Sequence, residues 1–119
     1  MLKNPVRAGA LALALLAVAP PHASAETVRA SWYGGSGERL NARTADGSRF
    51  SPRALTCAHR SLPFGTRLRV AYRGLSVVVR VNDRGPSIRT GRSLDLSRAA
   101  ADVLGLTRAG VGVVSINRL

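Results

Sequence analysis

Cysteine, histidine and acidic residues are scarce in this chain of 119 residues. Cys57 is the only cysteine, so no intramolecular disulfide can form, and its apolar neighbours favour a buried, unreactive thiol. His59 would share a strand face with it, so a nucleophilic Cys57–His59 pair is the alternative. Beyond residue 25, His59 is the only histidine and the six acids are dispersed, which excludes a zinc site of ordinary ligands. We expect no metal ion and no cofactor.

Long hydrophobic runs are also missing. The longest one, Ala8–Ala19, is shorter than the roughly 20 residues that a membrane-spanning helix needs. It follows Lys3 and Arg7 and precedes the small-residue motif Ala23-Ser24-Ala25, a pattern that predicts a signal peptide over residues 1–25. A membrane helix is the alternative. No cysteine lies near the cleavage motif, so we expect an exported, periplasmic protein without a stable membrane anchor.

The chain also has few negatively charged residues, with 6 acidic residues against 18 basic ones. Two of the 18 lie in the leader, which leaves 16 minus 6, a net charge of +10, for a single predicted domain over residues 26–119. Such a charge attracts polyanions. Export argues against nucleic acid and leaves phospholipid headgroups, lipopolysaccharide and the carboxylates of the cell wall. The alternative is that scattered arginines keep a small domain soluble.

Alternating apolar and polar residues predict short strands over 28–33, 66–72, 76–81 and 111–117, and the middle two form a hairpin. Ser97 is a good helix N-cap, and apolar residues at helical spacing between Leu96 and Leu104, Val103 among them, predict one short helix that Gly105 ends. Gly112 favours a bend or a close backbone approach in the last strand. These elements favour a small closed β-barrel with a helical insert, and an OB-type barrel is the competitor.

The segment 76–86 carries the most informative pattern. Its valines at 77, 79 and 81 share one strand face, and the same parity places Asp83 at the end of that face, before Gly85-Pro86 stops the strand. A carboxylate at the edge of an apolar surface is a candidate for catalytic chemistry. The alternative is an Asx residue that holds the backbone of its own turn.

The chain resembles the rare lipoprotein A (RlpA) family from about Val28 to Arg118. The motifs that carry the resemblance occur in the family's order: ASWYGG at 30–35, TADG at 44–47, AHRSLPFGT at 58–66, VRVNDRGP at 79–86 and RSLDLSRAAADVLG at 92–105. The resemblance implies a mainly β fold, a six-stranded double-psi β-barrel with one short α-helix, related to expansins. It also implies an endolytic lytic transglycosylase that cleaves MurNAc–GlcNAc bonds in peptide-poor glycan strands of peptidoglycan and leaves a 1,6-anhydro end.

Asp83 matches the aspartate of the family's NDRGP motif and is the predicted catalytic acid, since one carboxyl group can serve both proton transfers of this reaction. His59 matches the family's AHR histidine and is the second predicted catalytic residue, with a structural histidine as the alternative. Asp95 precedes the helix and is interpreted as structural. Substrate contacts are expected from Tyr33, Thr44, Asn82 and Arg84, although whichever of Trp32 and Tyr33 faces inward belongs to the core.

One position departs from the family pattern. Family members commonly carry a glutamate implicated in catalysis after the TANG motif, and this chain has Ser48 after TADG. Glu38 or Asp46 would be the substitutes from the same loop. Two non-catalytic functions therefore stay open: an expansin-like glycan-binding module in cell wall organisation, and an interaction partner of cell-division or wall-synthesis proteins.

Overall fold

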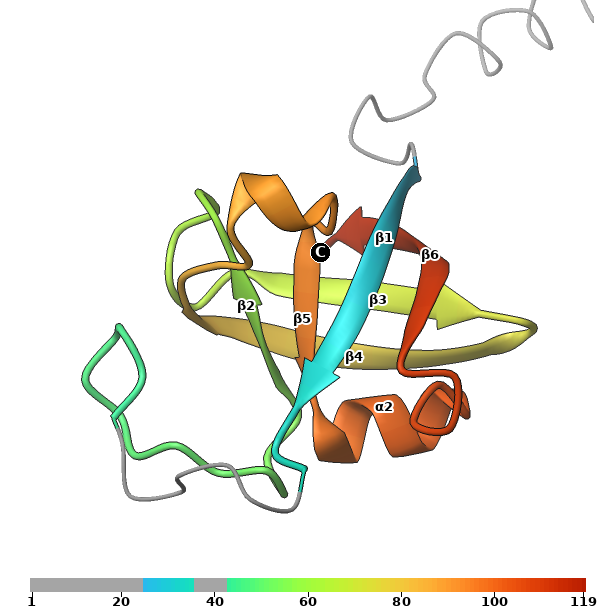
Figure 1. Ribbon diagram of the computed structural model, residues 1–119. Helices are drawn as coiled ribbons and strands as arrows, with labels where there is room; N and C mark the ends of the chain where they lie inside the picture. Colours follow the sequence, from blue (N-terminus) through green and yellow to red (C-terminus); the bar gives the residue numbers. More distant parts are fainter. Residues whose placement is uncertain (1–24, 36–42) are drawn as a thin grey trace, which may run out of the picture.

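Six strands close into a barrel in the computed structural model, which describes residues 25–35 and 43–119 (Figure 1). The strands are β1 (Glu26–Tyr33), β2 (Thr56–His59), β3 (Arg67–Tyr72), β4 (Leu75–Asp83), β5 (Leu94–Ser97) and β6 (Val111–Arg118). They pair around the barrel in the order β1, β5, β2, β4, β3, β6, with β1–β5 and β2–β4 parallel and the others antiparallel. The predicted mainly β, six-stranded barrel is confirmed, and the five-stranded OB-type competitor is excluded.

The predicted signal peptide falls outside the described residues except for Ala25, so its cleavage stays a prediction. Within 25–35 and 43–119, no helix has the length and apolar character to cross a bilayer.

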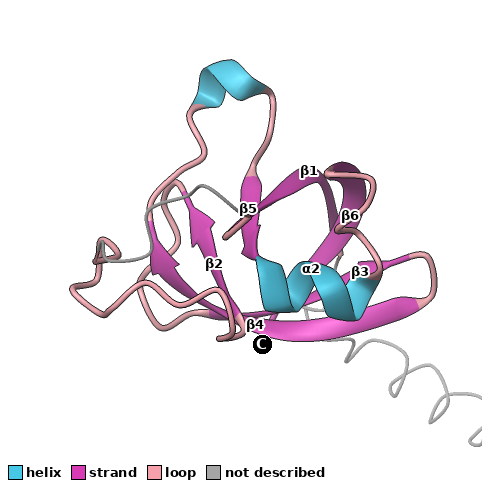
Figure 2. Cartoon of the chain, turned by 60° about the horizontal axis from the view of Figure 1, so that its bottom comes forward, coloured by secondary structure: helices cyan, strands magenta, loops and turns pink. Residues whose placement is uncertain are grey.

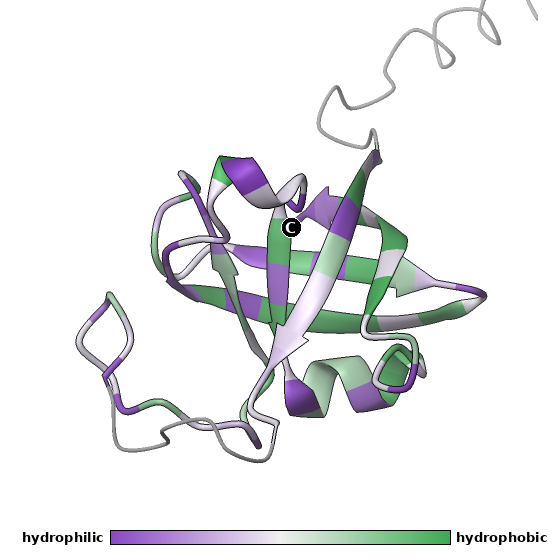
Figure 3. Cartoon of the chain, in the orientation of Figure 1, coloured by the Kyte–Doolittle hydropathy of each residue, from purple (hydrophilic) through white to green (hydrophobic). Residues whose placement is uncertain are grey.

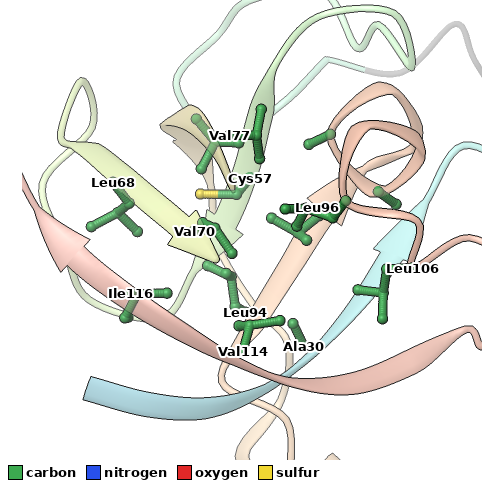
Figure 4. Packing of buried hydrophobic residues seen from close by; sticks show 14 of the residues in the cluster. Ala30, Cys57, Leu68, Val70, Val77, Leu94, Leu96, Leu106, Val114 and Ile116 are labelled. Atoms are coloured by element: carbon green, nitrogen blue, oxygen red, sulfur yellow. The ribbon is translucent and has the colours of Figure 1, made fainter. Parts of the chain in front are cut away.

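The barrel interior is filled by side chains that alternate along the strands. The β4 valines at 77, 79 and 81 are at most 8% exposed and lie in one core with Leu68 and Val70 of β3, as the hairpin pattern predicts. Cys57 points into the same core beside Val77, Val70 and Leu96 (Figure 4). Burial, with a smaller contribution from the charge of Asp95, raises the pKa of its thiol to about 12. The nucleophilic Cys57–His59 alternative is therefore wrong, because a buried neutral thiol cannot attack a substrate.

The one α-helix of the described residues, α2 (Arg98–Leu104), packs against β4 and β5 (Figure 2). The Ser97 side chain accepts a hydrogen bond from the amide of Ala100, and Gly105 ends the helix in the left-handed conformation, as predicted. Two parts of the predicted pattern are wrong. Leu96 belongs to β5 rather than to the helix face, and Val103 is 48% exposed. The buried helix residues are Ala100, Ala101 and Leu104.

Gly112 of β6 is a position of close approach, as the sequence indicated. A Cβ atom there would lie 2.7 Å from Leu106 Cδ1 and 2.9 Å from Tyr72 Cε1, so a larger residue would push these side chains apart. The glycine lets the connection after α2 pack closely on the barrel wall.

Candidate active site

The end of β4 is irregular, and this irregularity sets the direction of Asp83. In the parallel pair with β2, Val81 lies opposite Cys57 but Asp83 lies opposite Ala58, so Asn82 is an extra residue. Cys57 points into the core, and Ala58, as the next residue, faces the outside of the barrel wall. The Asp83 side chain therefore does not lie on the strand face that carries the buried valines. The sequence analysis placed it on that face from strand alternation, and this prediction is wrong. The carboxylate belongs to the outer side of the wall.

The two carboxylate oxygens of Asp83 have different surroundings. Oδ1 accepts hydrogen bonds from the backbone amides of Ala45 and Arg84, each at 2.9 Å. Oδ2 accepts no hydrogen bond from any residue in the described part of the chain. The side chain is half-buried. The turn-holding role that the sequence left open is thus present at Oδ1.

A short polar loop over residues 43–49 is attached to the same place. The amide of Asp46 donates to the backbone oxygen of Asn82 at 3.1 Å, beside the contact between Ala45 and Asp83. Inside the loop, Asp46 Oδ1 accepts hydrogen bonds from the Thr44 hydroxyl and from both the amide and the hydroxyl of Ser48. The loop is therefore a compact turn that rests on the end of β4.

Asp46 cannot replace the missing family glutamate as a proton donor. The hydrogen bonds from Ser48, then those from Thr44, hold the pKa of its carboxyl well below the usual range. Asp46 Oδ2 also lies 3.3 Å from a guanidinium nitrogen of Arg80. Asp46 stays ionised and organises the loop. The other suggested substitute, Glu38, lies outside the described residues.

The lowered pKa of Asp46 predicts an acid-sensitive loop. Its folded pKa is below the unfolded value of 3.8, so its contribution to stability is present above that pH and is lost as the pH falls further. We expect the Tm of the wild type to fall more steeply below about pH 3.8 than that of Asp46→Asn, which keeps an acceptor oxygen but no charge. Thermal unfolding between pH 2 and pH 6 measures the difference, and parallel curves would contradict this account.

Three of the four predicted substrate contacts lie below the surface. Asn82 is 4% exposed, Thr44 is 6% exposed and Tyr33 is 9% exposed. The Tyr33 hydroxyl lies 3.0 Å from Thr56 Oγ1, and its ring packs on Phe50 with centroids 5.1 Å apart. These residues support the wall and the loop around Asp83 and present little surface to a ligand.

Tyr33 and two carboxylates lie on one side of the barrel wall. Burial raises the pKa of Tyr33 to about 12; the hydrogen bond with Thr56 opposes this shift, and the negative charges of Asp95 and Asp83 add to it. The register explains the proximity of the acids, since Ala58 of β2 pairs with Asp83 on one side and with Asp95 on the other. The phenol stays protonated and neutral beside them.

Asp95 was interpreted from the sequence only as a residue before a helix. It lies instead inside β5, where its Oδ1 accepts a hydrogen bond from the Ser31 hydroxyl at 2.9 Å. Arg92 donates to the same hydroxyl oxygen at 2.6 Å. The alternation of Leu94, Asp95 and Leu96 was the signal that could have placed it on a strand, with its carboxylate on the side away from the core.

Arg84 is exposed, but its guanidinium is already engaged. Nη1 donates to the backbone oxygens of His59 at 3.2 Å and Leu62 at 2.8 Å, and Cζ lies 3.9 Å from the centroid of the Phe64 ring. The side chain joins the end of β4 to the connection after β2. Of the predicted substrate contacts, it is the one that the structure leaves at the surface.

His59 is a turn-holding residue. Its Nδ1 accepts hydrogen bonds from the amides of Ser61 and Leu62, both at 3.1 Å, so Nε2 carries the proton of the neutral ring. Desolvation, with Arg60 and Arg84 adding to it and Glu26 opposing it, holds its pKa below 6.5. Its side chain lines a pocket of about 450 Å³ with Glu26 and Arg118, and Asp83 is not part of that lining. The structure does not bring His59 and Asp83 together there.

A pH test separates this role from proton transfer. Because the folded pKa is lowered, His59 contributes stability that is present above pH 6.5 and is lost as the pH falls through that value. We expect the free energy of unfolding to rise between pH 5.5 and pH 7.5. In His59→Asn, whose amide oxygen replaces Nδ1 as the acceptor, this rise should disappear. Denaturant titrations across the range measure both proteins, and identical slopes would contradict the assignment.

Comparisons with known proteins agree with this architecture. The model of the family described as lytic transglycolase matches residues 25–116. The chain belongs to this family, with RlpA proteins as its relatives. It is 51% identical over 107 residues to the probable endolytic peptidoglycan transglycosylase RlpA of Nostoc sp., covering 83% of this chain and 29% of that protein. For the endolytic peptidoglycan transglycosylase RlpA of Neisseria meningitidis the identity is 43%, covering 79% of this chain and 39% of that protein. The chain thus spans well under half the length of these relatives.

Solved structures share the fold of this RlpA relative. An expansin of Clavibacter michiganensis superposes with a TM-score of 0.63 at 25% identity, covering 81% of this chain and 50% of that chain. The Streptomyces papain inhibitor superposes with a TM-score of 0.64 at 22% identity, covering 83% of this chain and 97% of that chain. Both likenesses support the double-psi β-barrel assignment.

Proposed function

We propose that this RlpA-family chain is an exported lytic transglycosylase that cleaves MurNAc–GlcNAc bonds of peptidoglycan, in strands poor in stem peptides. The observation that carries the proposal is the asymmetric carboxylate of Asp83, with Oδ1 held by two backbone amides and Oδ2 without a partner among the described residues. The names of the RlpA relatives support the reaction type. Export rests on the signal-peptide pattern of residues 1–25.

The reaction needs one proton donor that later acts as a base. Protonated Asp83 Oδ2 gives its proton to the glycosidic oxygen as the bond from that oxygen to C1 of the muramyl residue breaks. The C6 hydroxyl of the same sugar then attacks C1, and its proton returns to Oδ2. No water is consumed, and the product carries a 1,6-anhydro ring. The two amides on Oδ1 fix the carboxyl group, so Oδ2 alone moves the proton.

The other predicted residues position this group within the proposal. Asn82 and Thr44 anchor the loop over 43–49 next to Asp83, and Arg84 fixes the connection that follows β2. His59 holds the turn after β2 through Nδ1 and offers the Nε2–H of its neutral ring to a glycan hydroxyl at its own pocket, which Asp83 does not line. Tyr33 keeps the wall beside the carboxylates closed.

A second function, a glycan-binding module without catalysis, is favoured by Ser48. The serine occupies the position of the family glutamate, and its hydroxyl is committed to Asp46 within the loop. One experiment separates the two functions: the domain over residues 26–119 is incubated with purified sacculi and with peptide-free glycan strands, and the products are analysed by mass spectrometry. The enzyme releases 1,6-anhydromuramyl fragments. A binding module pellets with the sacculi and releases none.

A further inference from the structure

The outer side of β3 and β4 carries three arginines that we call the basic face: Arg67, Arg69 and Arg80. Arg67 and Arg80 are direct cross-strand partners, and Arg69 lies two residues along β3 from Arg67, about 7 Å away on the same side. The inward positions between them are filled by buried Leu68 and Val79. Figure 3 shows this alternation of hydrophilic and hydrophobic residues along β3.

This arrangement is unfavourable for the isolated domain. Like charges directly opposite each other in an antiparallel pair destabilise a sheet. Among the described residues, the only acid that compensates any of the three is Asp46, which meets Arg80 at 3.3 Å while the Arg80 side chain stays 47% exposed. Arg67 and Arg69 have no side-chain partner in the described part of the chain. A sheet face with this pattern fits an anionic ligand laid across it.

Three other arginines of the chain, Arg60, Arg84 and Arg98, have structural contacts that account for them. Arg60 donates to the backbone oxygens of Pro86 and Arg92, Arg84 donates to those of His59 and Leu62, and Arg98 lies over the Trp32 ring. The basic face lacks such contacts at Arg67 and Arg69, so its charges remain available to a partner.

The basic face adjoins the proposed catalytic carboxylate. Arg80 precedes Asp83 by three residues on β4, and its ion pair with Asp46 ties it to the loop that also contacts Asp83 Oδ1. From this loop the charges continue across β4 to β3. A linear polymer that reaches Asp83 along this side of the barrel therefore passes over the three guanidinium groups.

We propose that the basic face binds the carboxylates of the glycan strand next to the cleavage site, an inference that rests on the proposed function. Each N-acetylmuramic acid carries a lactyl group, and its carboxylate is free wherever no peptide is attached to it. A regular row of carboxylates along a strand complements a row of guanidinium groups, which bind carboxylates with paired N–H donors.

Binding is tested in the Asp83→Asn background, so that the strands stay uncut. The double variant Arg67→Gln, Arg69→Gln is compared with a control double variant, Arg89→Gln, Arg108→Gln, whose exposed arginines lie in the 3-10 helix η2 (Ile88–Thr90) and in the turn after α2. The probes are peptide-free glycan strands, the same strands with methyl-esterified carboxyl groups, and polyphosphate. Isothermal titration calorimetry at low salt measures the affinity, and a thermal melt checks the fold.

Removal of Arg67 and Arg69 should weaken binding to the free-carboxylate strands about 2- to 30-fold, as expected for two surface ion pairs, and the control should change it less than twofold. Esterified strands should bind all variants equally weakly, and the Tm of the basic-face variant should not fall. Equal losses in both double variants, or tighter binding of polyphosphate than of the strands to the basic face, would overturn the proposal. If the wild type releases anhydro products but the basic-face variant binds the strands as tightly as before, only this inference is overturned. If the wild type releases no anhydro products, the proposed function is overturned.

Discussion

Asp83→Asn is expected to abolish release of 1,6-anhydromuramyl products, with a loss of about 10²- to 10⁴-fold in kcat, because an amide cannot donate or accept the transferred proton. The asparagine oxygen can still accept hydrogen bonds from the amides of Ala45 and Arg84, so the turn at the end of β4 should persist. Mass spectrometry of digests of peptide-free glycan measures the products, and circular dichroism checks the fold.

The matched control is Asp102→Asn, which removes an exposed carboxylate on α2 whose ion pair is with Arg98. It should leave product formation unchanged, since an exposed i,i+4 pair contributes little. Equal activity of Asp83→Asn and the wild type would remove Asp83 from the mechanism. Loss of the folded signal in Asp83→Asn would instead assign it the turn-holding role alone.

Leu96→Ala is expected to lower the free energy of unfolding by about 2–5 kcal/mol, the largest stability effect of the account. Leu96 is fully buried in β5 and lies between Trp32 of β1 and Cys57 of β2 in the barrel wall. Since the free energy of unfolding of a native protein is only about 5–15 kcal/mol, the variant should lose a large part of its stability. Urea titration of the domain over 26–119 measures the change.

Val103→Ala is the control for this prediction. Its side chain is 48% exposed on α2, so the change should stay within about 0.5 kcal/mol. A cost of Leu96→Ala as small as that expected for Val103→Ala would contradict the burial of Leu96 in the barrel wall.

The alternating strands were predictable because their pattern is local. The hairpin of β3 and β4 puts apolar residues at every second position and closes at Arg73-Gly74, so neighbouring residues alone define it. The helix was equally local, since Ser97 and Gly105 mark its two ends. The family motifs extended these elements to a six-stranded barrel.

The four-residue strand β2 was not predicted, because almost every residue in it is shielded. In β2 the residues Thr56, Cys57 and Ala58 are all buried, which removes the contrast between inside and outside that reveals a strand. The bulge at Asn82 depends on the pairing of β4 with β2, which comes from a distant segment of the chain. Strand alternation alone therefore predicted the wrong side of the sheet for Asp83.

For the candidate site, the sequence identified Asp83 but not the contacts that shape it. The partners of its Oδ1 and of His59 Nδ1 are backbone amides, which every residue carries and no side-chain pattern marks. The hydrogen bond from the Ser48 hydroxyl to Asp46 depends on the folded loop, so the sequence did not reveal it.

A two-acid mechanism, the alternative to the one-acid mechanism, would use Asp95 as its second carboxyl group. Asp95 and Asp83 both pair with Ala58, so two strand spacings, roughly 10 Å, separate their Cα atoms. Inverting hydrolases use two carboxyl groups about 6.5–9.5 Å apart with an activated water between sugar and base. A two-acid reaction would incorporate water into the product, and a one-acid reaction would not.

The decisive measurement is therefore a digest of peptide-free glycan strands in water labelled with heavy oxygen, followed by mass spectrometry of the new muramyl ends. The account predicts 1,6-anhydro ends that contain no label, produced by the wild type and missing with Asp83→Asn. Labelled reducing ends would contradict it, because they require a water molecule, rather than the C6 hydroxyl, as the group that attacks C1.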